Sequence, residues 1–205
     1  TYKYILNTSF TFTYVTDFFA EVSEAEGEKV SFINTRNVAD QQVYNLSVSY
    51  PKKINNWWNV YGSIYGYYTK FTANHPDFIP IDRVVYGGYA QSTFTLPKKY
   101  RLEVSGWYSS PSIWRGTFRT KSIGALNLAL GKNWNQWSAK LSFDDILYTI
   151  TWRANNRFGN LFIAGTGGSD SRTVVFFLSY YFGQNDVKTA RKRKSGAEDE
   201  QNRMQ

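Results

Sequence analysis

The chain lacks several residues on which much protein chemistry depends. Its 205 residues include no cysteine, one histidine and one methionine. The absence of cysteine excludes disulfides, thiolate metal sites and cysteine nucleophiles. The single histidine, His75, has no second histidine or cysteine with which to build a metal site, so we expect a solvent-exposed loop residue. The sequence therefore predicts no catalytic, metal-binding or cofactor-binding residue, no cofactor, and no enzyme.

A long apolar run is also missing. No segment reaches the roughly 18 unbroken apolar residues of a membrane-spanning helix, and the mean hydropathy is −0.47. Aromatic residues are nevertheless 19% of the chain, a composition that favours β-sheet. A membrane-crossing β-strand needs only about 9 to 11 residues, every second one apolar. A polar mean hydropathy is therefore compatible with insertion through strands.

The formal net charge of +8 raises the question of nucleic-acid binding. The densest basic run, residues 191–194, is followed at once by the acidic residues 198–200. From Asp186 onward there are six basic and four acidic residues, a net charge of +2. The remaining charge is spread over the chain without a basic face beside stacking aromatic residues. We therefore expect no nucleic-acid partner.

Alternation with a period of two is the dominant pattern. Leu46, Val48 and Tyr50 would lie on one face of a strand, with Asn45 and Ser47 on the other. The alternation predicts an all-β chain, a transmembrane antiparallel up-and-down β-barrel with about eight strands here. We place these strands at residues 4–16, 41–50, 57–71, 84–96, 100–119, 122–131, 136–149 and 172–183.

The connections between the predicted strands are of two kinds. Tight turns are expected at residues 51–54, 97–99 and 131–134, and longer segments at 23–41, 72–83 and 151–171. A short connection near Thr120 breaks the alternation, unless the residues after Pro111 form a projecting hairpin. Outer-membrane barrels have short periplasmic turns and longer extracellular loops. We therefore expect Pro51, Pro97 and Trp134 in the periplasm, and His75 and Gly167 outside the cell.

Aromatic residues are expected near both ends of the strands. Trp58 and Tyr68 are ten residues apart, about 33 Å along a strand and about 25 Å along the membrane normal at a tilt near 40°. Tyrosine and tryptophan prefer the headgroup level, so two belts at this separation indicate a bilayer. The first belt is predicted to contain Tyr50, Trp57, Trp58, Tyr100, Trp134, Trp137 and Tyr180. The second is predicted to contain Tyr14, Tyr67, Tyr68, Tyr86, Trp107 and Tyr108.

Some polar residues are candidates for the barrel interior. Those expected to face the lumen are Arg101, Glu103, Asn127, Lys140, Tyr61, Tyr65 and Tyr67. We favour internal salt bridges that stiffen the wall over the lining of a passage. In the last strand we expect Val174, Phe176, Leu178, Tyr180 and Phe182 to face lipid. Thr173, Val175, Phe177, Ser179 and Tyr181 should then face inward.

Two other motifs have simpler explanations than a site. Asp144 and Asp145 suggest a pair of carboxylates for calcium or acid-base chemistry, but neighbouring strand residues point to opposite faces. We place them at a strand irregularity or a lumen edge. The glycine-rich run 165–170 lacks the Lys-Ser/Thr of a phosphate-binding loop and precedes a strand. It predicts a flexible extracellular loop.

Three stretches of sequence resemble a known family. They are VYNLSVSYP at residues 43–51, SGWYSSPSIWRGTFRTKS at 105–122, and LSYYFG at 178–183 followed by VKTARKRKSGAEDE at 187–200. Together they resemble the C-terminal barrel portion of the outer membrane β-barrel family related to TonB-dependent receptors. The resemblance extends over essentially the whole chain.

The resemblance implies a longer protein with a signal peptide, a plug domain and a barrel of about 22 strands. Its implied partners are outer-membrane lipid, the plug, a TonB-type energising complex, and a small-molecule, oligosaccharide or peptide nutrient. The abrupt strand-like start at Thr1 also favours the C-terminal part of a longer chain. We expect residues 1–184 to supply barrel strands and 185–205 a charged periplasmic tail. Two alternatives stay open, a self-sufficient eight-stranded barrel with a structural or adhesive role and a soluble β-sandwich.

Overall fold

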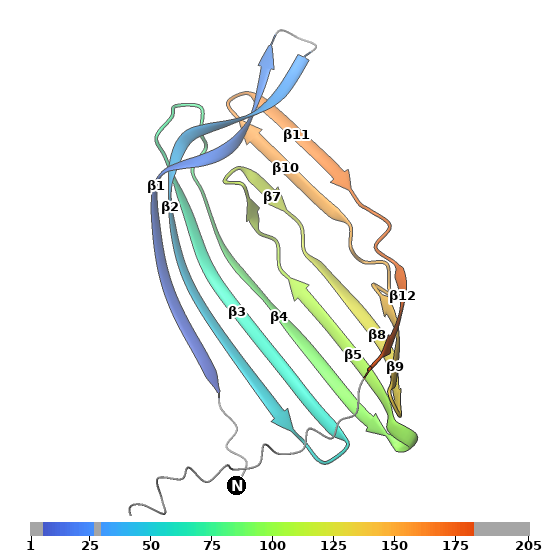
Figure 1. Ribbon diagram of the computed structural model, residues 1–205. Helices are drawn as coiled ribbons and strands as arrows, with labels where there is room; N and C mark the ends of the chain where they lie inside the picture. Colours follow the sequence, from blue (N-terminus) through green and yellow to red (C-terminus); the bar gives the residue numbers. More distant parts are fainter. Residues whose placement is uncertain (1–5, 27–29, 183–205) are drawn as a thin grey trace, which may run out of the picture.

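The computed structural model describes residues 6–26 and 30–182. Two antiparallel sheets account for almost all of the regular structure (Figure 1). The strands are β1 (Asn7–Glu26), β2 (Val30–Lys53), β3 (Trp58–Ala73), β4 (Ile81–Leu96), β5 (Tyr100–Ser109), β6 (Ile113–Trp114), β7 (Phe118–Thr120), β8 (Ile123–Trp134), β9 (Trp137–Asp144), β10 (Trp152–Phe158), β11 (Leu161–Gly167) and β12 (Thr173–Tyr180). One short 3₁₀ turn, η1 (Pro97–Lys99), joins β4 to β5. Among the described residues, no helix is long and apolar enough to cross a membrane.

The larger sheet has eight strands in the order β1-β2-β3-β4-β5-β8-β9-β12. Each of these strands includes the middle of one predicted strand, so the up-and-down antiparallel order is confirmed. The expected total of about eight is wrong, because the described residues form 12 strands in two sheets. The larger sheet is a curved wall with β1 and β12 at its two edges, not a closed barrel (Figure 1).

Register divides the larger sheet into two faces. Directly opposite residues share a face, and the pairs Leu46 with Gly66 and Leu102 with Leu130 carry one apolar surface from strand to strand. We call this the apolar face. It carries Phe10, Phe12, Tyr44, Leu46, Ile64, Val84, Tyr86, Leu102, Leu128, Leu130, Leu141, Phe176 and Leu178.

The opposite surface is hydroxylic and charged, and we call it the polar face. It carries Ser9, Thr11, Asn45, Ser47, Tyr65, Tyr67, Gln91, Thr93, Arg101, Glu103, Asn127, Lys140, Ser142 and Ser179. The expected faces of β12 agree with this register, since Phe176 lies opposite Leu141 and Phe177 opposite Lys140. The strand ends at Tyr180, so Tyr181 and Phe182 lie beyond it.

Aromatic side chains gather at both ends of the apolar face. Near the tight turns, Trp58 stacks on Phe94 at 5.8 Å and Trp137 packs on Tyr180 at 4.7 Å between ring centroids. At the other end, the Tyr86 and Tyr108 rings are 6.3 Å apart. The prediction that Tyr67 and Trp107 belong to the second belt is wrong. Tyr67 and Trp107 lie on the polar face, because they are opposite Asn45 and Ala125.

The three tight turns predicted from the sequence all lie at one end of the larger sheet. In the turn after β2, the Asn55 Oδ1 atom accepts hydrogen bonds from the backbone N–H groups of Trp57 and Trp58 at 3.0 and 2.8 Å. Two predicted turns are misplaced by a few residues, since β2 continues to Lys53 and β8 to Trp134. The third, at residues 97–99, is confirmed as η1. We call this the turn end and the opposite one the loop end.

At the loop end, long segments predicted as loops are strands. Residues 23–26 and 30–41 continue the pairing of β1 with β2 past a bulge between Val15 and Phe19, where Asp17 has a φ of 54°. Residues 151–171 contain β10 and β11, joined by a tight turn at Gly159 with Phe158 opposite Leu161. The strand predicted at 100–119 ends at Ser109, and β6 and β7 form a hairpin beyond Pro111. The option of a projecting hairpin there is confirmed.

The second sheet has four strands in the order β11-β10-β7-β6 and lies at the loop end (Figure 1). The main hydrophobic core sits beneath it. Its buried members include Val22, Val38, Phe71, Phe78, Ile81 and Phe158. Packing in this molecule is therefore concentrated where loops meet the wall, while the middle of the wall leaves large apolar side chains uncovered. The predicted charged tail, residues 185–205, lies outside the described residues.

Candidate functional site: the polar face and the loop end

An ion pair crosses three strands of the polar face. Lys140 of β9 lies 2.6 Å from Glu103 of β5, and β8 runs between them. The pair can close because the β8 residues below it, Ala129 and Gly131, are small. Glu103 and Lys140 were both predicted to face the lumen, where internal salt bridges were expected without a named pair, and the structure brings these two residues together.

Arg101 and Asn127 share this face with different roles. Arg101 lies opposite Gly131 and has no acidic partner among the residues that the structure describes. The Asn127 side-chain oxygen accepts the backbone N–H of Asp145 at 2.9 Å. Asn127 therefore holds the connection that leaves β9, while the Arg101 guanidinium is available to solvent or ligand.

Tyrosines line the middle of the polar face. The hydroxyl group of Tyr89 donates to Gln91 at 2.6 Å, and the Tyr61 ring lies 6.0 Å from that of Tyr89. Tyr65 stacks on Tyr67 at 6.3 Å and covers Gly87, where a Cβ would lie 2.5 Å from the Tyr65 hydroxyl oxygen. Glycine is thus required at position 87 by the close approach of the Tyr108 carbonyl oxygen and of the Tyr65 ring. The predicted lumen tyrosines, Tyr61, Tyr65 and Tyr67, lie on one wall.

At the loop end, separate connections are joined to one another by hydrogen bonds. The β6–β7 turn binds β1 through the Thr117 hydroxyl, which donates to the Glu21 carbonyl, and through an Arg115–Glu21 ion pair. The β10–β11 turn binds the β3–β4 loop, where the Gly159 N–H donates to the Asp77 carbonyl at 3.0 Å. The buried Asn156 amide also donates to the Ser23 hydroxyl group at 3.1 Å. These contacts fix the second sheet over the end of the wall.

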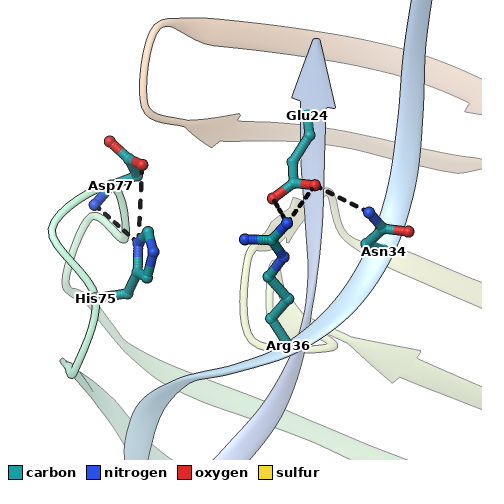
Figure 2. A network of polar contacts seen from close by, with 5 residues as sticks. All are labelled: Glu24, Asn34, Arg36, His75 and Asp77. Carbon is teal, nitrogen blue, oxygen red and sulfur yellow. Dashed lines mark hydrogen bonds and ion pairs between the residues drawn. The ribbon is translucent and has the colours of Figure 1, made fainter. Parts of the chain in front are cut away.

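Figure 2 shows two polar contacts on this part of the molecule. Glu24 of β1 accepts from Asn34 at 2.9 Å and pairs with Arg36 at 2.9 Å, so β1 and β2 are linked beyond the bulge. In the β3–β4 loop, the Asp77 N–H donates to His75 Nδ1 at 3.2 Å. The His75 ring lies 5.9 Å from that of Phe158 and is half-buried. His75 is a loop residue, as expected, but it is only partly exposed, because Phe158 of the β10–β11 hairpin packs against it.

Asp144 and Asp145 do not form a carboxylate pair. Asp144 ends β9 and accepts from the Thr173 hydroxyl group at 3.0 Å. Asp145 is buried in the connection that follows and accepts from the N–H groups of Thr149 and Ile150 at 2.8 and 3.0 Å. Burial alone would raise the pKa of Asp145, but hydrogen bonds from Ser171, Thr149 and Ile150 outweigh it and lower the pKa to about 2. Asp145 is a structural anchor for the loop.

The structure also places the glycine-rich run and shows a cleft. Residues 165–167 of the glycine-rich run belong to β11, an edge strand, and not to a flexible loop. No group of three or more histidine, cysteine or carboxylate side chains gathers within the described part of the chain. A cleft of about 310 Å³ that was not predicted from the sequence lies between the β3–β4 loop and the second sheet, lined in part by Arg119 and Arg157. Its residues come from segments predicted as loops or as a continuous strand.

Lipid is the environment that the apolar face requires. Phe10, Ile64 and Phe176 are 68%, 67% and 64% exposed, and such side chains form a continuous patch far larger than a soluble surface carries. Aromatic rings border this patch at both ends, as in membrane-spanning sheets. Fold and surface together define a membrane β-barrel wall.

Comparison with known proteins gives the family. The sequence profile of an outer membrane protein beta-barrel family matches residues 1–180, and the chain belongs to this family. Membership supports a location in the bacterial outer membrane. No curated protein and no solved structure matches the chain.

Proposed function

We propose that the chain forms part of the wall of a transport barrel of the TonB-dependent receptor kind, which takes up a nutrient across the bacterial outer membrane. The observation that carries the proposal is an eight-stranded sheet with a continuous polar face and two open edges. The proposed role is non-enzymatic. It consists of binding a nutrient at the loop end and conducting it along the polar face.

The edges argue for a wall wider than the described strands. Unpaired strand edges are not tolerated in lipid, where every backbone N–H and C=O needs a partner. β1 and β12 each have one neighbour, and they lie on opposite sides of the curved wall (Figure 1). We propose that further strands join both edges. The closed barrel would then be wide enough for a plug domain, as in barrels of about 22 strands.

The polar face suits such an interior. An eight-stranded barrel fills its centre with side chains, whereas many positions here carry serine, threonine, alanine or glycine. The proposed partners are lipid on the apolar face, a plug and its energising complex on the polar side, and a small molecule, oligosaccharide or peptide as cargo.

Cysteine cross-linking tests the width of the barrel, since the chain has no cysteine of its own. A pair at Thr11 and Asn45, which are opposite each other in β1 and β2, is the positive control. Ser9, Thr11 and Thr13 of β1 are then each paired with Val175 of β12. We expect cross-linking in the control and none between β1 and β12. Efficient β1–β12 disulfides within one chain would show an eight-stranded barrel and contradict the proposal.

Uptake tests transport directly. Cells without the protein should lose accumulation of a particular nutrient, and collapse of the proton gradient should abolish the same accumulation in wild-type cells. Uptake that persists without a proton gradient would exclude an energised receptor.

A further inference from the structure

The cleft at the loop end has two chemically different walls. Its volume of about 310 Å³ is within the range of small-molecule sites, roughly 300 to 1,000 Å³. The side from the β3–β4 loop is apolar and includes Phe78 and Ile79. The side from the second sheet carries the polar residues Arg119, Asn155 and Arg157, together with the apolar ring of Phe162, which lies opposite Arg157. A ligand that fills the cleft would therefore have an apolar part and a polar part.

Strand pairing brings the three polar residues together. Asn155 of β10 lies opposite Arg119 of β7, and Arg157 is two residues further along β10. Opposite residues, and residues two apart in a strand, share a face. Arg153 precedes Asn155 by two residues and adds a further positive charge to the same face. The positive charges are thus set side by side by the backbone.

Arg119 and Arg157 differ from two other arginines at the loop end, Arg36 and Arg115. Arg36 pairs with Glu24 at 2.9 Å and Arg115 with Glu21, so their charges are compensated within the protein. Within the described ranges, Arg119 and Arg157 have no acidic partner, and the Asn155 side chain has no hydrogen-bond partner. Both guanidinium groups are exposed to the cleft's solvent. Neighbouring like charges repel unless an anion lies between them.

We propose that this cleft binds a small organic anion. Its carboxylate or phosphate group would accept from Arg119, Arg157 and the Asn155 amide, since guanidinium groups bind such anions with two parallel hydrogen bonds. Its apolar part would lie against Phe78, Ile79 and Phe162. Ile81, which also lines the cleft, belongs to the polar face of β4. The anion is therefore a soluble molecule on the side away from lipid, not a lipid headgroup.

The inference rests on the proposed function in one respect, because it names the chemical class of the nutrient that the loop end would capture. Binding to the purified protein, however, needs neither an energised membrane nor conduction. Failure of uptake with intact anion binding would count against transport alone. Normal uptake without anion binding would count against this inference alone.

Calorimetric titration of the full-length protein in detergent tests the site with defined probes. We expect phenyl phosphate and benzoate to bind, inorganic phosphate to bind at least about tenfold more weakly because it lacks the apolar part, and neutral phenol to show no binding. Raising the salt concentration should weaken binding. Equal binding of phenol and phenyl phosphate would overturn the proposal.

Matched arginine variants locate the binding. R119Q and R157Q should each lower the affinity for phenyl phosphate about tenfold, the size expected for one charged hydrogen bond. The control is R172Q, since Arg172 is at the same end but lies over the Tyr148 ring at 4.3 Å, and its affinity should stay within about twofold of wild type. Heat-modifiable migration confirms that each variant is folded. Wild-type affinity in the folded R119Q/R157Q double variant, or no binding of either organic anion by wild type, would refute the site.

Discussion

At the scale of single residues, the side of the sheet on which a side chain lies determines what can replace it. Ile64 and Ser63 are neighbours in β3, but Ile64 is on the apolar face and Ser63 lies opposite Tyr89 on the polar face. Leu178 is also on the apolar face, only two residues from Tyr180 at the aromatic border. The free-energy cost of an arginine substitution should therefore depend on the face of the sheet that carries the residue and on its depth in the membrane.

Arginine substitutions test this assignment. Ile64→Arg should cost about 2 to 4 kcal/mol because it lies midway between Trp58 and Tyr68, and Leu178→Arg should cost about 0 to 2 kcal/mol because it lies near the headgroups. Ser63→Arg and Ser179→Arg should be nearly neutral. Urea unfolding of the barrel in lipid measures all four. Equal tolerance at positions 63 and 64 would be incompatible with lipid on the apolar face.

Gly87 provides a second test at this scale. A Cβ there would lie 2.4 Å from the Tyr108 carbonyl oxygen and 2.5 Å from the Tyr65 hydroxyl group. Gly87→Ala should therefore destabilise the fold by about 1 to 3 kcal/mol. The control Gly62→Ala meets nothing within 4 Å and should be neutral or stabilising by up to about 1 kcal/mol. A shift of the urea midpoint that is the same for both variants would contradict the close approach of the Tyr108 carbonyl and the Tyr65 ring to Gly87.

At the scale of elements, sequence alternation predicted the eight strands of the wall but not the strands beyond it. Lipid on one side and water on the other enforce alternation in the wall, as in Leu46 to Tyr50. Outside lipid that selection is absent, and the extension of β2 from Val30 to Ala39 mixes exposed Phe32 and Ile33 with buried Val38. A signal for the β10–β11 hairpin was present in Gly159 and Asn160, a pair typical of tight hairpin turns.

The connection after β9 allows a test by pH. The carboxylate of Asp145 accepts four hydrogen bonds from Ser171, Thr149 and Ile150. Because the folded pKa is lowered to about 2 from 3.8, its stabilisation is complete above pH about 4 and is lost as pH falls towards 2. The difference in thermal midpoint between wild type and Asp145→Asn should follow this course. A difference that is the same at pH 2 and pH 7 would contradict the role of the ionised carboxylate.

At the scale of the whole molecule, the sequence predicted the outer-membrane class and the polar face, while the cleft and the docked second sheet required the structure. Arg119 and Arg157 are 38 residues apart in the sequence, and only the pairing of β7 with β10 brings their strands together. No spacing rule connects such positions. Their juxtaposition follows from the way the connections pack on the core around Phe71 and Phe158.

We propose that the wall crosses the outer membrane with its turn end in the periplasm and its loop end outside the cell. Single cysteines at Pro97, in η1, and at Gly167, at the end of β11, give a sharp test of this orientation, since both positions are exposed. An impermeant maleimide added to intact cells should label position 167 and not 97, and both should react after the outer membrane is permeabilised. Labelling of position 97 on intact cells, with or without labelling of position 167, would rule out this orientation.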